Sequence, residues 1–202
     1  MKIICIGRNY TDHIKELDNQ KPKDPVIFLK PDTSLIQKNQ PFFKPAFSEK
    51  IHHELELVIK INRVGKFIDK KFAHKYYENF TVGIDFTARD IQDELKNKRL
   101  PWEKSKAFDG SALVGNWLNK KDFNLENLNF SLKKNSRLVQ KGNSKLMLWK
   151  IDELISYVSK FFTLKIGDLI FTGTPSGVGD VIEGDILNGF VESTNCFVIK
   201  IK

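Results

Sequence analysis

The chain has 202 residues, 41% of them hydrophobic, which is enough for one substantial core, and we expect residues 1–202 to form a single domain. Its 33 basic and 25 acidic side chains give a formal net charge of +8, but no compact basic run or nucleic-acid motif accompanies this charge. The composition therefore argues against nucleic acid as a partner, and we expect most of the lysines on a solvated surface.

The cysteines and the apolar runs indicate the compartment. Cys5 and Cys196 lie too far apart for a CxxC metal or redox motif. No apolar stretch approaches the roughly 20 residues that cross a bilayer, and the short N-terminal run predicts a strand and not a signal peptide. We therefore expect a cytoplasmic protein that has no membrane partner.

The predicted elements begin with a strand over 2–6, which ends at Gly7, and a helix over 10–17. A polar, proline-punctuated loop over 19–25 leads into a short apolar run over 26–29. The later predictions are strands over 54–61 and 80–86, helices over 69–77, 88–98 and 149–162, a hairpin of 129–132 with 138–141, and β structure divided by glycines in the last forty residues. Strands outnumber helices without regular alternation, so we predict a β-rich α+β fold with mixed, mainly antiparallel sheets.

The stretch IHHELELVIKI, residues 51–61, alternates carboxylates with leucines. Successive side chains of a strand point to opposite faces, so Glu54 and Glu56 share a face on which their charges repel each other. That face is either open to solvent or turned toward a cation. Asp85, near the end of an apolar strand, is costly to bury unpaired and can supply a third oxygen ligand for a hard divalent cation.

The segment GRNYTDHIKE places His13 and Glu16 three residues apart on the predicted helix, where their side chains can meet. A carboxylate hydrogen-bonded to an imidazole orients the ring and raises its basicity, as a general base requires. An ordinary exposed His–Glu pair has the same spacing, so both interpretations stay open.

The segment FTGTPSGVGD, residues 171–180, contains glycines that permit tight turns and close approach of the backbone to a ligand. It lacks the GK[ST] ending of a P-loop and no evident helix follows it, so it does not predict nucleotide binding. A plain turn between strands is the alternative. Lys106, in KSKAFDGSALVG, can add positive charge to the same region.

Together these segments resemble the fumarylacetoacetate hydrolase family. The resemblance is strongest to its short single-domain branch of acylpyruvases, oxaloacetate decarboxylases or tautomerases, and hydroxyhepta-diene-dioate isomerases. The matching stretches keep the family's order over nearly the whole chain: GRNYTDHIKE, VIFLKPDTSLI, HHELELVIKI, GIDFTARDIQ, PWEKSKAFDGSALVG, RLVQKGNS and GDLIFTGTPSGVG. The combination of ExE, a later aspartate and TGTPxGVG in this order makes the resemblance specific.

The resemblance implies a β-roll-like arrangement of mixed sheets, and a homodimer. It implies that Glu54, Glu56 and Asp85 bind Mg²⁺ or Mn²⁺, at a site that Ca²⁺ can also fill in crystals. It further implies that His13 and Glu16 form a catalytic dyad on a lid-like segment that becomes ordered when substrate binds.

Three more positions match functional residues of the family. Lys106 matches the active-site lysine, Thr174 a contact to the substrate carboxylate, and Gln92 a polar residue on the substrate side. Arg8 and Lys30 also lie in matching segments, but the resemblance gives them no specific role.

The expected activity is Mg²⁺- or Mn²⁺-dependent hydrolysis of the C–C bond of acylpyruvate-type 2,4-diketo acids, with a small anionic 2-keto acid as substrate. The cation would stabilise the enolate with help from Lys106, while His13, oriented by Glu16, would activate the water. Decarboxylation or tautomerisation of oxaloacetate and isomerisation of 2-hydroxyhepta-2,4-diene-1,7-dioate need the same enolate site, and likeness of fold cannot choose among them. The non-enzymatic alternative is a metal-dependent binding module without turnover. The presence of His13, Glu16 and Lys106 together argues against it.

Overall fold

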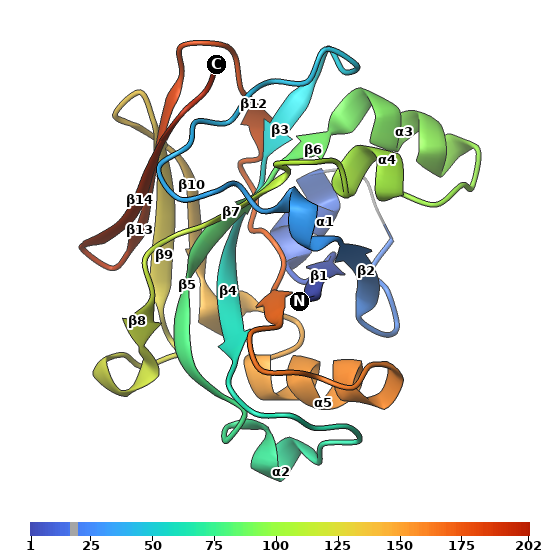
Figure 1. Ribbon diagram of the computed structural model, residues 1–202, viewed down its shortest axis with the longest axis vertical. Helices are drawn as coiled ribbons and strands as arrows, with labels where there is room; N and C mark the ends of the chain where they lie inside the picture. The colour runs from blue at the N-terminus through green and yellow to red at the C-terminus, as the bar shows by residue number, and fades with distance from the viewer. Residues whose placement is uncertain (17–19) are drawn as a thin grey trace.

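Figure 1 shows the computed structural model, which describes residues 1–16 and 20–202. The predicted β-rich α+β class is confirmed, because in these residues strands outnumber helices and most strand pairs are antiparallel. The end of the predicted first helix at Leu17 and the start of the following loop at Asn19 lie outside the described residues.

The largest sheet of the described residues combines strands from both ends of the chain. Its strands are β1 (Ile3–Gly7), β2 (Val26–Lys30), β4 (Leu55–Ile61), β5 (Tyr77–Asp85), β7 (Ala112–Val114), β8 (Leu118–Asn119) and β11 (Leu169–Phe171). The order is β2-β1-β11-β4-β5-β7, and β8 also pairs with β5. β1 and β11 run parallel, with Ile4 opposite Ile170, and the other pairs of this sheet are antiparallel.

Two smaller antiparallel sheets complete the β structure of the described residues. One contains β9 (Asn129–Lys134), β10 (Arg137–Asn143), β13 (Ile186–Val191) and β14 (Thr194–Lys200), in the order β10-β9-β13-β14. The other contains β3 (Ile51–His53), β6 (Thr87–Ala88) and β12 (Gly179–Asp180), in the order β12-β3-β6. The pairing of β9 with β10 confirms the predicted hairpin.

The helices lie around the sheets. They are α1 (Thr11–Glu16), α2 (Lys70–Ala73), α3 (Arg89–Asn97), α4 (Glu103–Lys106) and α5 (Ile151–Phe161), with short 3-10 helices at Asp32–Ser34, Lys120–Asp122 and Ser144–Leu146. In Figure 1, α3 and α4 lie together beside β6, and α2 and α5 lie together at the opposite end of the molecule. None of the helices in the described part of the chain has the length and apolar character of a membrane span.

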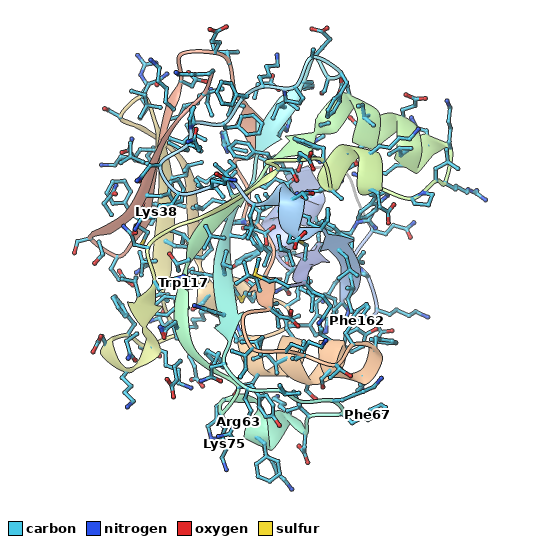
Figure 2. All side chains as sticks on the ribbon, in the orientation of Figure 1. Lys38, Arg63, Phe67, Lys75, Trp117 and Phe162 are labelled. Atoms are coloured by element: carbon cyan, nitrogen blue, oxygen red, sulfur yellow. The ribbon has the colours of Figure 1, made fainter. Side chains whose placement is uncertain are left out.

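Hydrophobic cores cover both faces of the central strand β4. Leu55 and Leu57 point into the main core, while Val58 points into a second cluster that contains Phe171. Trp117, labelled in Figure 2, packs against this second cluster. Burying large aliphatic side chains contributes about 1.5–3 kcal/mol each, so the strand that carries Glu56 is held firmly from two sides.

The predicted strand over 54–61 is confirmed as β4, while residues 51–53 before it form the separate strand β3 in another sheet. At the junction, the Glu54 carbonyl accepts a hydrogen bond from the Asp85 amide at 2.9 Å. One predicted element differs from the structure. The predicted helix over 69–77 is only the short α2, capped by the Asp69 side chain. Tyr77 is not helical, because it is the first residue of β5 and pairs with Ile61.

Candidate active site

The functional residues predicted from the sequence gather around one cavity. It is lined by residues from several separate segments, among them His13, Glu54, Glu56, Asp85, Gln92, Lys106 and Thr174. Glu16 is joined to this group through His13, to which it is hydrogen-bonded. The antiparallel pairing of β4 with β5, which sets Leu55 opposite Ile84, brings the acidic residues of the two strands to the same end of the sheet.

Glu54, Glu56 and Asp85 form a buried acidic cluster. Each contributes a carboxylate oxygen, and these oxygens all lie within 4.8 Å of one another. The side chains are 5%, 2% and 0% exposed, respectively, which excludes the alternative that this face of residues 51–61 is open to solvent. Buried carboxylates require cations or hydrogen-bond donors beside them.

Lys106 supplies positive charge to two of these carboxylates. Its Nζ donates to Glu54 Oε2 at 2.8 Å, to Asp85 Oδ2 at 2.8 Å and to the Thr87 hydroxyl at 2.7 Å. Burial alone would lower the pKa of Lys106, but Asp85 and Glu54 outweigh it and raise the pKa. All three N–H groups of the ammonium are thus engaged, and in this arrangement Lys106 orients the two carboxylates.

Lys30, which had no assigned role from the sequence, lies against the other side of Asp85. Its Nζ is 2.8 Å from Asp85 Oδ1 and donates to the Ser111 hydroxyl at 2.9 Å and to the Lys106 carbonyl. The side chain is entirely buried. Asp85 therefore lies between two ammonium groups, hydrogen-bonded to Lys106 through Oδ2 and ion-paired with Lys30 through Oδ1.

Arg89, at the start of α3, pairs with the remaining oxygen of Glu54. Its guanidinium donates to Glu54 Oε1 and to Gln92 Oε1, and its Nε donates to His52 Nδ1 at 3.2 Å. His52 Nε2 in turn lies 3.0 Å from Asp180 Oδ1. The sequence did not single out Arg89, since only the burial of the first turn of α3 against the cavity distinguishes it from the many surface cations.

The two glutamates have opposite electrostatic environments. Burial disfavours the charge of Glu54, but Lys106 and Arg89 outweigh it and hold the pKa well below its usual value. Burial, together with the charges of Asp85 and Glu54, raises the pKa of Glu56 well above its usual value. Three convergent carboxylates, one of them under-compensated, are the donor set that a hard divalent cation such as Mg²⁺ or Mn²⁺ prefers, so these residues fit such an ion.

His13 and Glu16 form a hydrogen-bonded pair at the edge of the cavity. His13 Nδ1 lies 3.1 Å from Glu16 Oε2, and Glu16 Oε1 accepts a hydrogen bond from the Gly177 amide at 2.9 Å. His13 is 6% exposed, which excludes the ordinary exposed pair. Burial lowers the pKa of His13, although Glu54 and Glu16 act in the opposite direction. A neutral imidazole with its Nδ1–H on Glu16 has a free lone pair on Nε2 and can accept a proton there.

The glycine-rich turn after β11 makes specific contacts with the site and is therefore more than a plain connection. The Gly173 amide donates to Glu56 Oε2 at 2.6 Å, and the Thr174 hydroxyl accepts from Gln140 Nε2 at 2.9 Å. Gly173 has φ +97°, and a Cβ there would lie 2.7 Å from Asn9 Cβ. Glycine is required at this point, because a side chain would push the backbone away from Glu56.

Comparison with known proteins defines the class. Residues 2–199 match the family model described as fumarylacetoacetate (FAA) hydrolase C-terminal. The chain is 39% identical over 201 residues to "Oxaloacetate tautomerase FAHD1, mitochondrial" of Bos taurus, a match that covers 99% of this chain and 91% of the relative. It is 40% identical over 188 residues to "Oxaloacetate tautomerase YcgM" of Escherichia coli strain K12, covering 92% and 86% of the two chains.

A solved structure agrees with these sequence matches. Fumarylpyruvate hydrolase from Pseudomonas aeruginosa, in complex with Mn²⁺ and pyruvate, superimposes with a TM-score of 0.93 at 30% identity and covers 100% of this chain and 89% of that one. The chain therefore belongs to the fumarylacetoacetate hydrolase family, and it is an enzyme of that family.

Proposed function

We propose that this enzyme interconverts the keto and enol forms of oxaloacetate, with Mg²⁺ or Mn²⁺ held by Glu54, Glu56 and Asp85. The observation that carries the proposal is the meeting of this acidic cluster with the buried, Glu16-bound imidazole of His13 in one cavity. Relatives named as oxaloacetate tautomerases support this activity above the hydrolysis that the sequence favoured.

Glu54, Glu56 and Asp85 would hold a divalent cation, which would supply Lewis-acid stabilisation of the enolate charge. The chain's own residues do the remaining work. His13 Nε2 takes the proton from C3 of the keto form while Glu16 keeps the ring oriented and stabilises its cationic form. The C2 oxygen of the resulting enolate takes a proton from solvent to give the enol. In the reverse direction the enol O–H gives its proton to solvent and His13 returns a proton to C3.

The surrounding cations prepare the site for an anionic substrate. Lys106, Lys30 and Arg89 fix the oxygens of Glu54 and Asp85, so these carboxylates do not have to reorganise during the reaction. Positive charge near the C2 oxygen also favours the enolate form of the substrate.

Hydrolysis of acylpyruvates is the second candidate. The hydrogen-bonded pair of His13 and Glu16 favours hydrolysis, because a base in this position can activate water for attack on a distal carbonyl. The Gly177 amide also donates to Glu16 and holds the pair in place. The similar structure from Pseudomonas aeruginosa is a fumarylpyruvate hydrolase, which supports the same alternative.

The decisive experiment follows the decay of the oxaloacetate enol by its ultraviolet absorbance, with Mg²⁺ and with Mn²⁺, beside a parallel assay of acetylpyruvate cleavage. We expect rapid enol–keto conversion, slowed by a factor of roughly 10²–10⁴ in His13→Ala. If the wild-type protein left the enol to decay at its spontaneous rate, the tautomerase proposal would be wrong. Cleavage of acetylpyruvate without tautomerisation would establish the second candidate instead.

The cation has a separate test that does not depend on activity. Mg²⁺ should raise the thermal unfolding midpoint of the wild-type protein, because an ion that binds only the folded state stabilises it. Glu56→Gln should abolish this shift, and Glu183→Gln, an exposed glutamate outside the cavity, should retain it. An equal shift in both variants would contradict the assignment of Glu56 as a ligand.

The homodimer and the cytoplasmic location remain proposals that rest on the resemblance and on the sparse cysteines. One chain has a mass of 23.3 kDa, so light scattering during gel filtration distinguishes a monomer from a dimer directly. A mass of one chain at micromolar concentration would contradict the dimer.

A further inference from the structure

Two cations in the cavity take no part in holding the acidic cluster. Arg8 and Lys96 both line the cavity, together with Trp102 and Phe28. Within residues 1–16 and 20–202, neither side chain forms an ion pair or a hydrogen bond, whereas Lys106 and Arg89 have carboxylate partners. The cavity therefore has positive charge available for a ligand.

The position of Arg8 is fixed by its neighbour. Arg8 has φ +60°, a left-handed conformation that non-glycine residues rarely adopt. The buried Asn9 side chain holds this turn, because its Nδ2 donates to the Thr172 carbonyl at 2.7 Å and to the Trp149 carbonyl at 3.1 Å, while its Oδ1 accepts from the Trp149 amide at 2.8 Å. Strain of this kind persists only where surrounding contacts impose it, and it concentrates at functional sites.

Lys96 comes from the last turn of α3 and approaches the cavity beside an aromatic wall. Its Nζ lies 5.9 Å from the centre of the Trp102 ring. Burial lowers the pKa of Lys96 to about 8, and the charge of Arg89 acts in the same direction, while Asp93 and Glu54 oppose it and Arg8 adds a smaller lowering effect. Arg8 and Lys96 line the same cavity, so an anion bound in it is attracted by both charges.

We propose that Arg8 and Lys96 form a subsite for the distal carboxylate of a dicarboxylic 2-keto acid, whose keto-acid end faces Glu54, Glu56 and Asp85. The Arg8 guanidinium can donate hydrogen bonds to both oxygens of that carboxylate, and the Lys96 ammonium can donate a further charge-assisted hydrogen bond. The inference rests on the proposed function and narrows it to substrates that have an anionic group at each end. A monocarboxylic keto acid leaves both cations unpaired and is bound less well.

Binding of a matched ligand pair tests the subsite without turnover. 2-Oxoglutarate and 2-oxovalerate have equal chain length and differ only in a distal carboxylate or methyl group. Calorimetric titration in the presence of Mg²⁺ measures their dissociation constants for the wild type, Arg8→Gln, Lys96→Gln and Lys104→Gln. Lys104 is an exposed cation outside the cavity and serves as the control for loss of charge.

We expect the wild type to bind 2-oxoglutarate at least roughly tenfold more tightly than 2-oxovalerate. Arg8→Gln and Lys96→Gln should each lose about tenfold for 2-oxoglutarate, with little change for 2-oxovalerate, and Lys104→Gln should change neither. Arg8→Lys keeps the positive charge but loses the planar guanidinium, so it should retain part of the preference for 2-oxoglutarate over 2-oxovalerate. Thermal unfolding checks that each variant is folded.

The outcomes separate this inference from the proposed function. A wild type that converts the oxaloacetate enol but shows no preference for 2-oxoglutarate, or variants that weaken both ligands equally, would overturn the subsite alone. A wild type that prefers 2-oxoglutarate without accelerating enol conversion would overturn the tautomerase proposal alone. Failure to bind either ligand would overturn the subsite.

Discussion

Lys30→Met tests the buried charges of the site through stability. The Lys30 side chain is completely buried, its Nζ lies 2.8 Å from Asp85 Oδ1, and it also donates to the Ser111 hydroxyl at 2.9 Å. Methionine keeps the unbranched apolar stem and removes the ammonium group. Asp85 then keeps its ion pair with Lys106 but loses the partner of its second oxygen.

Breaking a buried ion pair from one side lowers the free energy of unfolding by about 3–5 kcal/mol, and here the Asp85 carboxylate stays buried with only one of its two cationic partners. In a chain of this length, each kcal/mol shifts the unfolding midpoint by roughly 2–4 °C, so Lys30→Met should unfold roughly 6–20 °C below the wild type. The double variant Lys30→Met/Asp85→Asn removes both charges and should cost less than the sum of the single variants.

Urea unfolding at pH 7, followed by tryptophan fluorescence in the presence of a chelator, measures these differences without a contribution from bound cations. Lys141→Met, at an exposed position of β10, is the control and should change stability by no more than about 0.5 kcal/mol. If Lys30→Met resembled this control, or if the double variant cost the full sum, the account of the buried charges would be refuted.

Two further predictions concern parts of the fold away from these charges. Burial disfavours the charge of Asp168, but hydrogen bonds from Lys2 outweigh this effect and lower the pKa of Asp168. The charged carboxylate therefore stabilises the folded protein above the pKa that Asp168 has in the unfolded chain, and this stabilisation is lost as the pH falls through the pKa of the folded state. Asp168→Asn should therefore cost about 1–3 kcal/mol in urea unfolding at pH 7, and a deficit that persisted undiminished at roughly pH 2 would contradict this reasoning. Gly83→Ala should cost about 1–3 kcal/mol in the same assay, because a Cβ there would lie 2.3 Å from the Leu113 carbonyl oxygen; full stability would show that β5 and β7 are not packed this closely.

The fold class could be predicted from the sequence because its strands are short, apolar and separated by turn residues, as in the hairpin of β9 and β10. The assignment of residues 51–53 to a strand of a different sheet could not be predicted, because the alternation of residues 51–61 continues through Glu54. What divides that stretch is pairing at long range: His53 pairs with Gly179 in one sheet and Leu55 with Ile84 in another. Such partners leave no trace in the local pattern.

For the candidate site, the sequence motifs identified the carboxylates and the His13–Glu16 pair, which the fold brings to one cavity. The cations were harder to select, since the chain has 33 basic residues and most look alike in sequence. Lys30 and Arg89 stand out only because the fold removes them from water and sets them against Asp85 and Glu54. Burial, which depends on the whole chain, is the signal that the sequence lacked.

The parallel pairing of β1 with β11 has a consequence for biosynthesis. Ile3–Cys5 cannot pair until Leu169–Phe171 and the long segment between them have been synthesised. The turn after β1 contains Arg8, and the turn after β11 contains Thr174. A contact so distant in sequence closes slowly, and a nascent chain lacks it altogether until this late segment has emerged. The cavity that contains Arg8 and Thr174 can therefore be completed only after Leu169–Phe171 have been translated.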